Sequence, residues 1–395
     1  MQDDPIVITG AARTPIGAFN GALASLTAPQ LGAAALGAAM AQSGLDGKQI
    51  DEVLMGQVLP AGVGQAPARQ AAFAAGIAQA TPCVGLSKVC GSGMKALITG
   101  HDSLLAGSNG IVLAGGMESM TNAPYLLPKA RNGYRLGHGK LIDHMFFDGL
   151  EDHYEHQGRL MGTFAEDCAA HYSFSRSAQD DFALESYRRA RAATENGQFA
   201  AEITSVEVKT RRETKQVARD ESPFAVDTAR IPELKPAFRD DGTVTAANAS
   251  SISDGAAALA LMRRSQAEAL GATQRAVIRG HSGHAQDPAW FTTAPIGAIN
   301  KLLQRLGWHR ADVDLFEINE AFAVVVMAAM QELDISHDRI NVYGGACALG
   351  HPIGASGARL VVTLLNAMEQ HDCKRGIATL CIGGGEATAV ALERV

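Results

Sequence analysis

The segment Ser92-Gly93-Met94-Lys95-Ala96 returns 264 residues later as Ser356-Gly357-Ala358-Arg359-Leu360. Three further pairs of segments match in the same order, at offsets between 263 and 270: residues 6–10 with 276–280, 51–54 with 314–317, and 113–118 with 381–386. Each match is short, but four in one order at nearly one offset indicate an internal duplication. The sequence therefore predicts two related α/β halves, each mixing strands with helices on its faces.

A stretch of different composition, rich in turn residues, histidines and charge, separates the two halves and has no second copy. We expect residues 1–120, completed by 250–270, to form the first half, residues 121–249 an inserted loop or lid domain, and residues 271–395 the second half. Within the insert, Ser177 is expected to cap a helix running to residue 199. Prolines interrupt residues 205–247, which favours loop with short strands. Long excursions from a core usually bind something, so we expect the insert to contribute to a binding site.

Composition excludes several classes of protein. The chain has 395 residues, of which 47% are hydrophobic and 19% charged, which suits a folded protein with more than one core. Its longest apolar run, residues 321–330, is about half of what a membrane-spanning helix needs. A net charge of −7 without a basic tract argues against nucleic acid as a partner. Six cysteines, no C-x-x-C pair and no targeting signal favour a reduced cytoplasmic protein without structural zinc.

Cys90 is the strongest local candidate for chemistry. Residues 81–89 are apolar enough for a short strand, and the spacing of apolar residues after Gly93 predicts a helix. Cys90 would then lie at a strand-to-helix junction, where free N–H groups and the helix dipole lower the pKa of a thiol. The alternative, a buried structural cysteine, is the commoner fate of a cytosolic cysteine.

Three other positions offer complementary chemistry. His351 lies in a rigid turn, Gly350-His351-Pro352, where it would act as a base or simply be satisfied by nearby backbone. Cys381 lies near the end of a predicted strand, residues 377–382, and precedes glycines whose N–H groups could form an oxyanion site. The alternative is that Cys381 is an ordinary small apolar residue of the strand. Asn319 follows a buried strand predicted over residues 313–318, and would otherwise cap the next helix.

Weaker patterns favour solvated surface. The loop histidines His138, His144, His153 and His156 have no fixed spacing for metal ligation, so we expect no metal. The cluster Arg211, Arg212, Lys215 and Arg219 could hold phosphate groups, although charge runs more often cover a solvated face. Motifs for nucleotide phosphates, zinc proteases and serine hydrolases do not occur in the sequence.

Taken together, five blocks resemble the signatures of thiolases. They are Val89-Cys90-Gly91-Ser92-Gly93-Met94-Lys95-Ala96, residues 248–257, Asn319-Glu320-Ala321-Phe322, residues 344–354 and Cys381-Ile382-Gly383-Gly384-Gly385. The resemblance covers essentially the whole chain, with the blocks in family order and spacing. Within the family, the blocks are most similar to those of the acetyl-CoA acetyltransferases. The resemblance implies an α/β fold of two halves in five αβαβα layers with a loop domain inserted in the first. It also implies a homodimer or homotetramer.

The resemblance assigns roles to the candidate residues. Cys90 would carry an acyl group, His351 would accept the Cys90 proton, and Cys381 would remove the α-proton of a second acetyl-CoA. The N–H groups of Cys90 and Gly383 would form one oxyanion hole, and His351 with a water held by Asn319 the other. The implied reaction is the reversible condensation of two acetyl-CoA to acetoacetyl-CoA and CoA, with CoA as a substrate and no cofactor.

The implied CoA contacts depend on fewer residues. Ser250 and Ala246 match positions along the pantetheine arm, and Phe238 one that borders it. Leu160-Met161-Gly162 stands where short-chain members usually have His-Met-Gly. Phe291 is expected near the acyl group, and its bulk favours a short chain. For the phosphates we expect Arg211 and Arg212 to supply positive charge.

Two other functions remain open at this point. A degradative 3-ketoacyl-CoA thiolase of broader chain length is favoured by Leu160. A non-catalytic acyl-CoA-binding relative would lack one signature residue, and Cys90, His351, Asn319 and Cys381 are all present. Ketoacyl-carrier-protein synthases, which share the architecture, usually lack the second cysteine, and a metal hydrolase using the loop histidines is the most distant alternative.

Overall fold

The first half is a five-stranded sheet with helices on both faces. A computed structural model describes residues 4–154, 158–209 and 213–395. The strand order is β4-β3-β5-β10-β1, with β3 parallel to β4 and β5, and β10 antiparallel to β5 and β1. The strands are β1 (Ile6–Arg13), β3 (Glu52–Gly56), β4 (Cys83–Leu86), β5 (Ile111–Ser119) and β10 (Ser253–Arg263), and β2 (Gly17–Ala18) pairs with β10. Helices α1 (Ala28–Gln42) and α2 (Pro67–Ala74) pack on one face and α3 (Ser92–Ala106) on the other.

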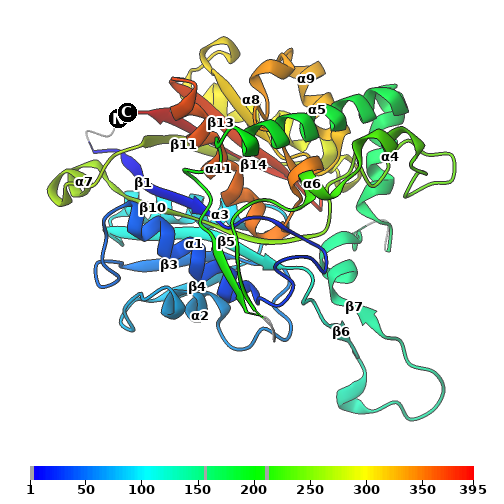
Figure 1. The fold of residues 1–395 in the computed structure, drawn as a ribbon, viewed down its shortest axis with the longest axis horizontal. Helices are drawn as coiled ribbons and strands as arrows, with labels where there is room; N and C mark the ends of the chain where they lie inside the picture. Colours follow the sequence, from blue (N-terminus) through cyan, green and yellow to red (C-terminus); the bar gives the residue numbers. More distant parts are fainter. Residues whose placement is uncertain (1–3, 155–157, 210–212) are drawn as a thin grey trace.

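The second half repeats this arrangement with one strand fewer. Its strand order is β12-β13-β14-β11. The elements are β11 (Ala276–Ala285), α8 (Ala294–Leu306), β12 (Leu315–Ile318), α9 (Ala323–Leu333), α11 (Ile353–Gln370), β13 (Arg375–Ile382) and β14 (Glu386–Arg394). Two residue pairs between β1 and β11, Val7 with Val277 and Ile8 with Ala276, join the two sheets along one edge. Outer helices, sheet, central helices, sheet and outer helices give five layers, so the predicted thiolase architecture is confirmed (Figure 1).

The repeated Ser-Gly segments lie where the two central helices cross. A Cβ atom on Gly93 of α3 would come within 2.9 Å of the Ala358 nitrogen and 3.0 Å of the Gly354 oxygen in α11. On the other helix, a Cβ atom on Gly357 would overlap the backbone of Met94. Because only glycine allows this approach, the repeated segment fixes how the two halves meet.

One of the four repeat matches is out of register. Val53 of β3 pairs with Leu113 of β5, and in the second half Phe316 of β12 pairs with Ile377 of β13. Residues 113–118 therefore correspond to 377–382, and the match to 381–386 is wrong by four residues. The glycines caused the error: Gly115 and Gly116 lie inside β5, where a Cβ atom would overlap neighbouring backbone, whereas Gly384 and Gly385 form a turn with φ of 91° and 82°.

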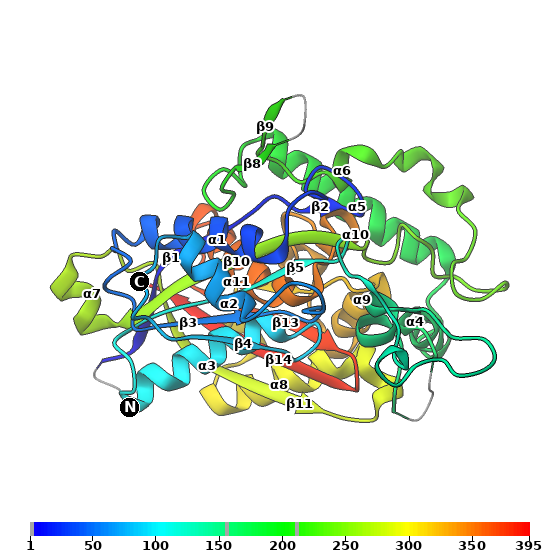
Figure 2. The same ribbon diagram turned by 90° about the horizontal axis from the view of Figure 1, so that it is seen from below.

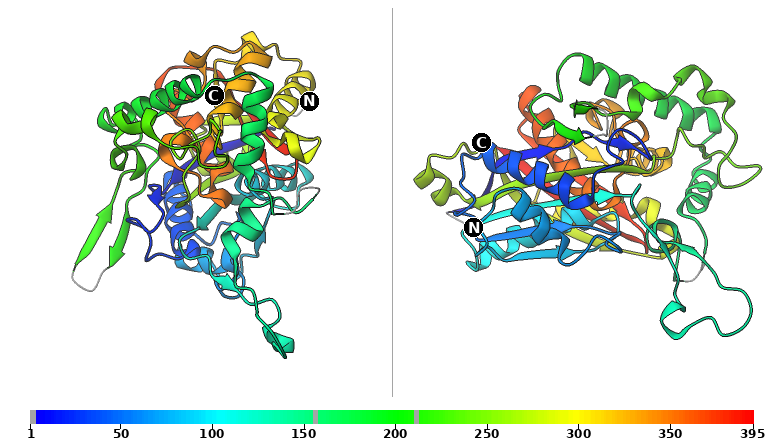
Figure 3. Two further views of the ribbon diagram at one scale, coloured as in Figure 1. Left: turned by 90° about the vertical axis from the view of Figure 1, so that its right-hand side faces the viewer. Right: turned by 60° about the horizontal axis from the view of Figure 1, so that its bottom comes forward.

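The insert forms an irregular cap over one end of both halves. It contains β6 (Tyr125–Leu126), β7 (Ile142–Asp143), α4 (Met161–His171), α5 (Arg176–Glu195), α6 (Ser222–Ala225) and the hairpin β8 (Val206–Lys209)–β9 (Thr214–Val217). The hairpin and the β6–β7 loop project from the body of the molecule (Figures 2 and 3). The predicted cap of α5 is wrong by two residues, because the Ser175 hydroxyl, rather than Ser177, accepts the N–H of Ala178.

The remaining helices are short. They are α7 (Arg264–Leu270), α10 (Ala346–Leu349) and single turns at 130–132, 146–150, 228–233, 288–293, 310–312 and 337–339. Within the described ranges, every helix is too short or too polar to cross a lipid bilayer.

Candidate active site

A single apolar cavity of about 350 Å³ lies where the two halves and the insert meet. Most of the sequence-predicted site residues line it: Cys90, Leu160, Met161, Phe238, Ala246, Ser250, Phe291, His351, Cys381 and Gly383. Asn319 lies directly behind His351, with its Nδ2 atom 3.4 Å from Nε2 of the imidazole. Arg211 and Arg212 lie outside the described residues. The structure thus gathers residues from six separate segments of the chain around one space.

Cys90 is presented by a strained turn between β4 and α3. The preceding residue, Val89, has φ of 45°, a left-handed conformation that a β-branched side chain rarely adopts. The Ser92 hydroxyl holds this turn, since its oxygen accepts the N–H of Lys88 at 2.8 Å and donates to the Val89 carbonyl at 2.7 Å. Such strain often accompanies a functional residue that the backbone must place.

The thiol of Cys90 is less acidic than its position at a helix start suggested. Burial raises the pKa of Cys90 to about 11, although N–H groups of Gly383 and of Cys90 itself contact the thiol and favour the thiolate. The expectation of a lowered pKa is therefore wrong, because desolvation outweighs two backbone donors. Those two N–H groups nevertheless converge on the sulfur, where an oxyanion hole would need them.

Hydrogen bonds fix the tautomer of His351. Its Nδ1 atom lies 2.5 Å from the Ser356 hydroxyl, and that hydroxyl donates its own proton to the Pro352 carbonyl at 3.0 Å. The Ser356 oxygen must therefore accept, so Nδ1 carries the imidazole proton and Nε2 keeps a lone pair, which faces the amide nitrogen of Asn319. Burial, followed by the charge of Arg359, lowers the pKa of His351 to about 3 and keeps the ring neutral. His351 is thus a neutral acceptor on the cavity wall.

Asn319 is positioned by the second half rather than acting as a helix cap. It follows β12, its N–H donates to the Thr379 carbonyl at 3.0 Å, and α9 begins later, with Phe322 as its N-cap. Its Oδ1 accepts from Arg359 at 3.5 Å, which turns the amide nitrogen toward His351. The neighbouring Glu320 accepts from Ser186 of α5 at 2.7 Å, so the insert is tied to the same corner.

Cys381 ends β13 inside an aromatic enclosure. Burial, followed by the proximity of Cys90, raises the pKa of Cys381 well above its ordinary value. The rings of Phe291 and Phe322 lie 6.5 Å apart and pack in the same buried cluster as Cys381. On the other side, a Cβ atom on Gly162 would overlap the Phe238 ring, so that glycine lets the insert close against the cavity. Both sulfurs are therefore thiols at neutral pH, held in apolar surroundings.

Sequence reasoning missed two polar residues at this site. Ser356 was noted only as part of the repeat. Glu118 at the end of β5 accepts N–H groups of Val58 and Gly354 at 2.9 Å each, and of Leu59 at 3.2 Å. Burial raises the pKa of Glu118 to about 7, and its charge disfavours a thiolate on Cys90. An acid at the end of the otherwise apolar repeat segment 113–118 was the available signal for it.

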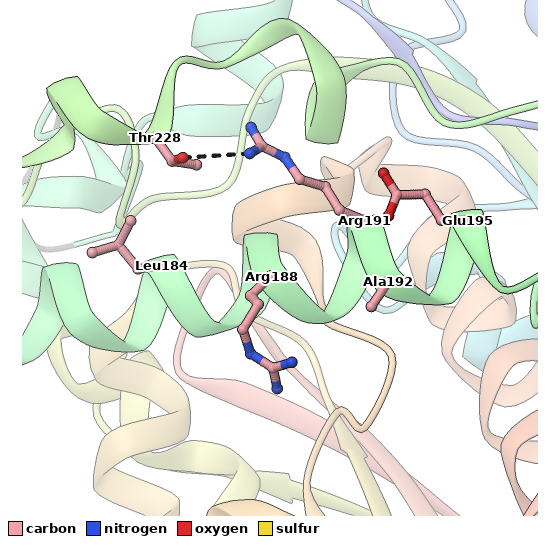
Figure 4. Close-up of a pocket in the computed structure, with 6 residues that line it drawn as sticks. All are labelled: Leu184, Arg188, Arg191, Ala192, Glu195 and Thr228. Carbon is pink, nitrogen blue, oxygen red and sulfur yellow. Dashed lines mark hydrogen bonds between the residues drawn. The ribbon is translucent and has the colours of Figure 1, made fainter.

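The other candidates do not form a second site. Arg188 and Arg191 line a hollow beside α5, but Arg188 pairs with Glu185 and Arg191 donates to carbonyls and Thr228 (Figure 4). Of the cationic cluster, Lys215 pairs with Glu213 and Arg219 lies over the Phe224 ring. His144 bonds Asp148 and His153 bonds the Phe147 carbonyl, while His156 lies outside the described residues. Among the described residues these loop histidines form no group that could hold a metal.

The comparisons with known proteins agree with this geometry. The model of the thiolase N-terminal domain matches residues 6–265, and that of the thiolase C-terminal domain matches residues 272–394. The chain therefore belongs to the thiolase family of enzymes.

The relatives extend the match over the full length. An acetyl-CoA acetyltransferase from Pseudomonas aeruginosa is 48% identical, with all of both chains covered. One from Escherichia coli is 48% identical, with 98% of this chain and 99% of the relative covered. A thiolase from Ascaris suum, solved in complex with coenzyme A, superposes with a TM-score of 0.93 at 39% identity, covering 99% of this chain and all of the other.

Proposed function

We propose that this chain catalyses the reversible condensation of two acetyl-CoA to acetoacetyl-CoA and CoA, through an acyl group carried on Cys90. The observation that carries the proposal is that Cys90 of the first half, and His351 and Cys381 of the second, line one cavity. The names of full-length relatives support acetyl-CoA as the substrate. The relative solved with coenzyme A supports CoA binding by this fold.

In the first half-reaction, the sulfur of Cys90 attacks the thioester carbonyl carbon and its proton passes to Nε2 of His351. The developing oxyanion is held by the N–H groups of Cys90 and Gly383. The C–S bond to CoA then breaks, and the leaving thiolate takes the proton of Cys381. This order suits the raised pKa values of both cysteines, because each sulfur begins as a thiol and the departure of CoA creates the base needed next.

In the second half-reaction, the Cys381 thiolate removes the α-proton of a second acetyl-CoA. The enolate charge is stabilised by His351, now protonated, and by a water held by Asn319. The carbanion attacks the acetyl group on Cys90, and the C–S bond to Cys90 breaks. His351 returns its proton to the Cys90 sulfur, so the site regains its starting state.

The cavity favours a short acyl group. Phe291 is buried against Phe164 and Phe322, at ring distances of 6.2 and 6.5 Å, and narrows the space beside Cys381. Leu160, which lines the same cavity, is the observation that favours a thiolase of broader chain length. Initial rates of thiolysis with acetoacetyl-CoA, 3-ketohexanoyl-CoA and 3-ketooctanoyl-CoA decide between them. We expect acetoacetyl-CoA to be fastest; equal or faster rates with the longer substrates would favour the second function.

Binding of CoA is proposed to use the insert. Ser250, Ala246, Phe238, Leu160 and Met161 line the cavity and would flank the pantetheine arm. Arg211 and Arg212 are proposed to meet the phosphates. Changing both arginines to glutamine should then raise KM for CoA severalfold while leaving kcat unchanged, and an unaltered KM would refute this assignment.

Assembly and compartment are further parts of the proposal. Large apolar side chains are exposed on the projecting β6–β7 loop, including Tyr125, Leu127 and Leu136. Within the described residues, β4 is an edge strand that pairs on one side only, with β3. Such surfaces support a homodimer or homotetramer. All six cysteines are free, which supports the reducing cytoplasm as the working compartment.

A further inference from the structure

A cluster of metal-ligating side chains lies away from the active-site cavity, at a junction between the two halves. His101 and Asp102 belong to α3 of the first half, and His281 belongs to β11 of the second. The Oδ1 atom of Asp102 lies 2.8 Å from Nε2 of His281 and 3.4 Å from Nδ1 of His101. One ligand atom from each of the three residues lies within 4.8 Å of the others. None of these residues lines the cavity around Cys90.

Two of the three ligand separations are close to those that a tetrahedral metal requires, and the third, between the two histidines, is at most 4.8 Å. Nitrogen and oxygen ligands bound to Zn²⁺ at about 2.0–2.1 Å lie about 3.4 Å from one another. The contact between His101 and Asp102 already has this length, and the contact between His281 and Asp102 is a few tenths of an ångström shorter. The two imidazole rings meet edge to face, with centroids 5.3 Å apart. Small side-chain rotations would therefore be enough to bring three ligands around one ion.

The donor types suit zinc. Two imidazoles and one carboxylate form a donor set that zinc prefers, while calcium and magnesium require more oxygen ligands.

The surroundings leave one coordination position open and place one cation nearby. The Asp102 side chain is about half exposed, at 53%, which leaves a path for an ion and a water. Arg305 donates to the His281 carbonyl at 3.2 Å, and its charge acts on His101. Its guanidinium does not pair with Asp102, so the carboxylate remains available while the nearby charge weakens binding.

We propose that His101, Asp102 and His281 bind one Zn²⁺ ion, with water in the fourth position, and that the ion fastens α3 to β11. The sequence could not indicate this site, because His281 lies 179 residues after Asp102 and no spacing motif connects it to the pair His101 and Asp102. The ion would have a structural role at the contact between the halves, apart from the chemistry at Cys90. The proposal does not rest on the proposed function.

The test is titration of the full-length protein with Zn²⁺ and Co²⁺. Asp102→Asn and His281→Gln each remove one ligand, and His284→Gln is the matched control, because His284 lies on the same strand but bonds Gln286 instead. We expect one Zn²⁺ per chain with an affinity that falls at least about tenfold in the two ligand variants but not in the control. Zinc should also raise the Tm of the unaltered protein and the control, and of neither ligand variant.

Cobalt spectroscopy separates this site from the thiols of Cys90 and Cys381. Nitrogen and oxygen ligation gives weak visible bands, whereas a thiolate ligand adds an intense charge-transfer band in the near ultraviolet. We expect the weak bands alone at the first equivalent, and their loss in Asp102→Asn. Absence of binding, equal affinity in all variants, or a thiolate band at the first equivalent would overturn the proposal.

Discussion

The two halves place different chemistry at corresponding positions. At the start of its central helix, the first half has Cys90, whereas the corresponding position of the second half is Gly354. At the end of the middle strand, the second half has Cys381, and the first half has Met117 followed by Glu118. The duplication thus gave both halves the same framework, in which strand ends and helix starts face each other. Different side chains at the corresponding positions then gave each half a different reactive group. The proposed nucleophile, Cys90, and the proposed base, Cys381, are therefore on different copies.

Backbone N–H groups of the second half contact two side chains of the first half. The N–H of Gly383 contacts the Cys90 thiol, and the N–H of Gly354 donates to Glu118. The close crossing of α3 and α11 at Gly93 and Gly357 makes these contacts possible. The following changes test how far the halves divide the reaction.

Removing the second-half thiol should separate the two half-reactions. Cys381→Ser leaves Cys90, His351 and the oxyanion donors intact, and the CoA thiolate can depart without the proton of Cys381, so acetylation of Cys90 should continue at a reduced rate. Condensation should fall by about 10²- to 10⁴-fold, the usual range for losing a general base. Acetylated protein measured by mass spectrometry, beside condensation rates, checks this. Normal condensation by Cys381→Ser would show that another group is the base.

The pH dependence of alkylation tests the burial of the first-half thiol. Because the pKa of Cys90 is raised to about 11, its thiolate fraction should increase about tenfold per pH unit between pH 7 and pH 10. The rate of iodoacetamide labelling at Cys90, followed by peptide mass spectrometry, should therefore rise about 10³-fold over that interval. A rate that levels off near pH 7 would mean that the helix start, rather than burial, controls the thiol.

Ser356 tests whether the second half fixes the tautomer of its histidine. Ser356→Ala removes the acceptor for the Nδ1 proton of His351, so Nε2 would no longer be held in its unprotonated form. We expect kcat to fall about 10²-fold. Ser356→Thr keeps the hydroxyl and should restore most of the rate. Because the lost hydrogen bond from Nδ1 also stabilises the protonated form of His351, the pH profile of kcat should change shape in the alanine variant alone. Equal rates in both variants would remove Ser356 from the mechanism.

Glu118 tests the smaller electrostatic contribution of the first half. At pH 8 its carboxylate is ionised and disfavours the Cys90 thiolate, so Glu118→Gln should lower the pKa of Cys90. We expect labelling at Cys90 to become about two- to fivefold faster at pH 8. Circular dichroism controls for folding, since Gln can accept fewer of the three N–H groups. Slower labelling by the folded variant would contradict this sign.

The sequence predicted what depends on local pattern and missed what depends on packing. The repeated Ser-Gly segment predicted the duplication. The turns and glycines around Cys90, His351 and Cys381 made these residues candidates, and the resemblance to thiolases selected them over the structural alternatives. The register of residues 113–118 was wrong because glycines in a crowded strand and in a tight turn look alike. The pKa of Cys90 was wrong because a helix start is visible in sequence and desolvation is not. Glu118 and the His101–Asp102–His281 cluster depend on contacts between distant segments, which no spacing reveals.

The most direct measurement is mass spectrometry of the unaltered protein after brief exposure to acetyl-CoA, with the modified peptide sequenced. The account predicts one acetyl group per chain, on Cys90, that disappears when excess CoA or a second acetyl-CoA is supplied. An acetyl group on Cys381 or elsewhere, or acetoacetyl-CoA formed without any adduct on Cys90, would contradict it.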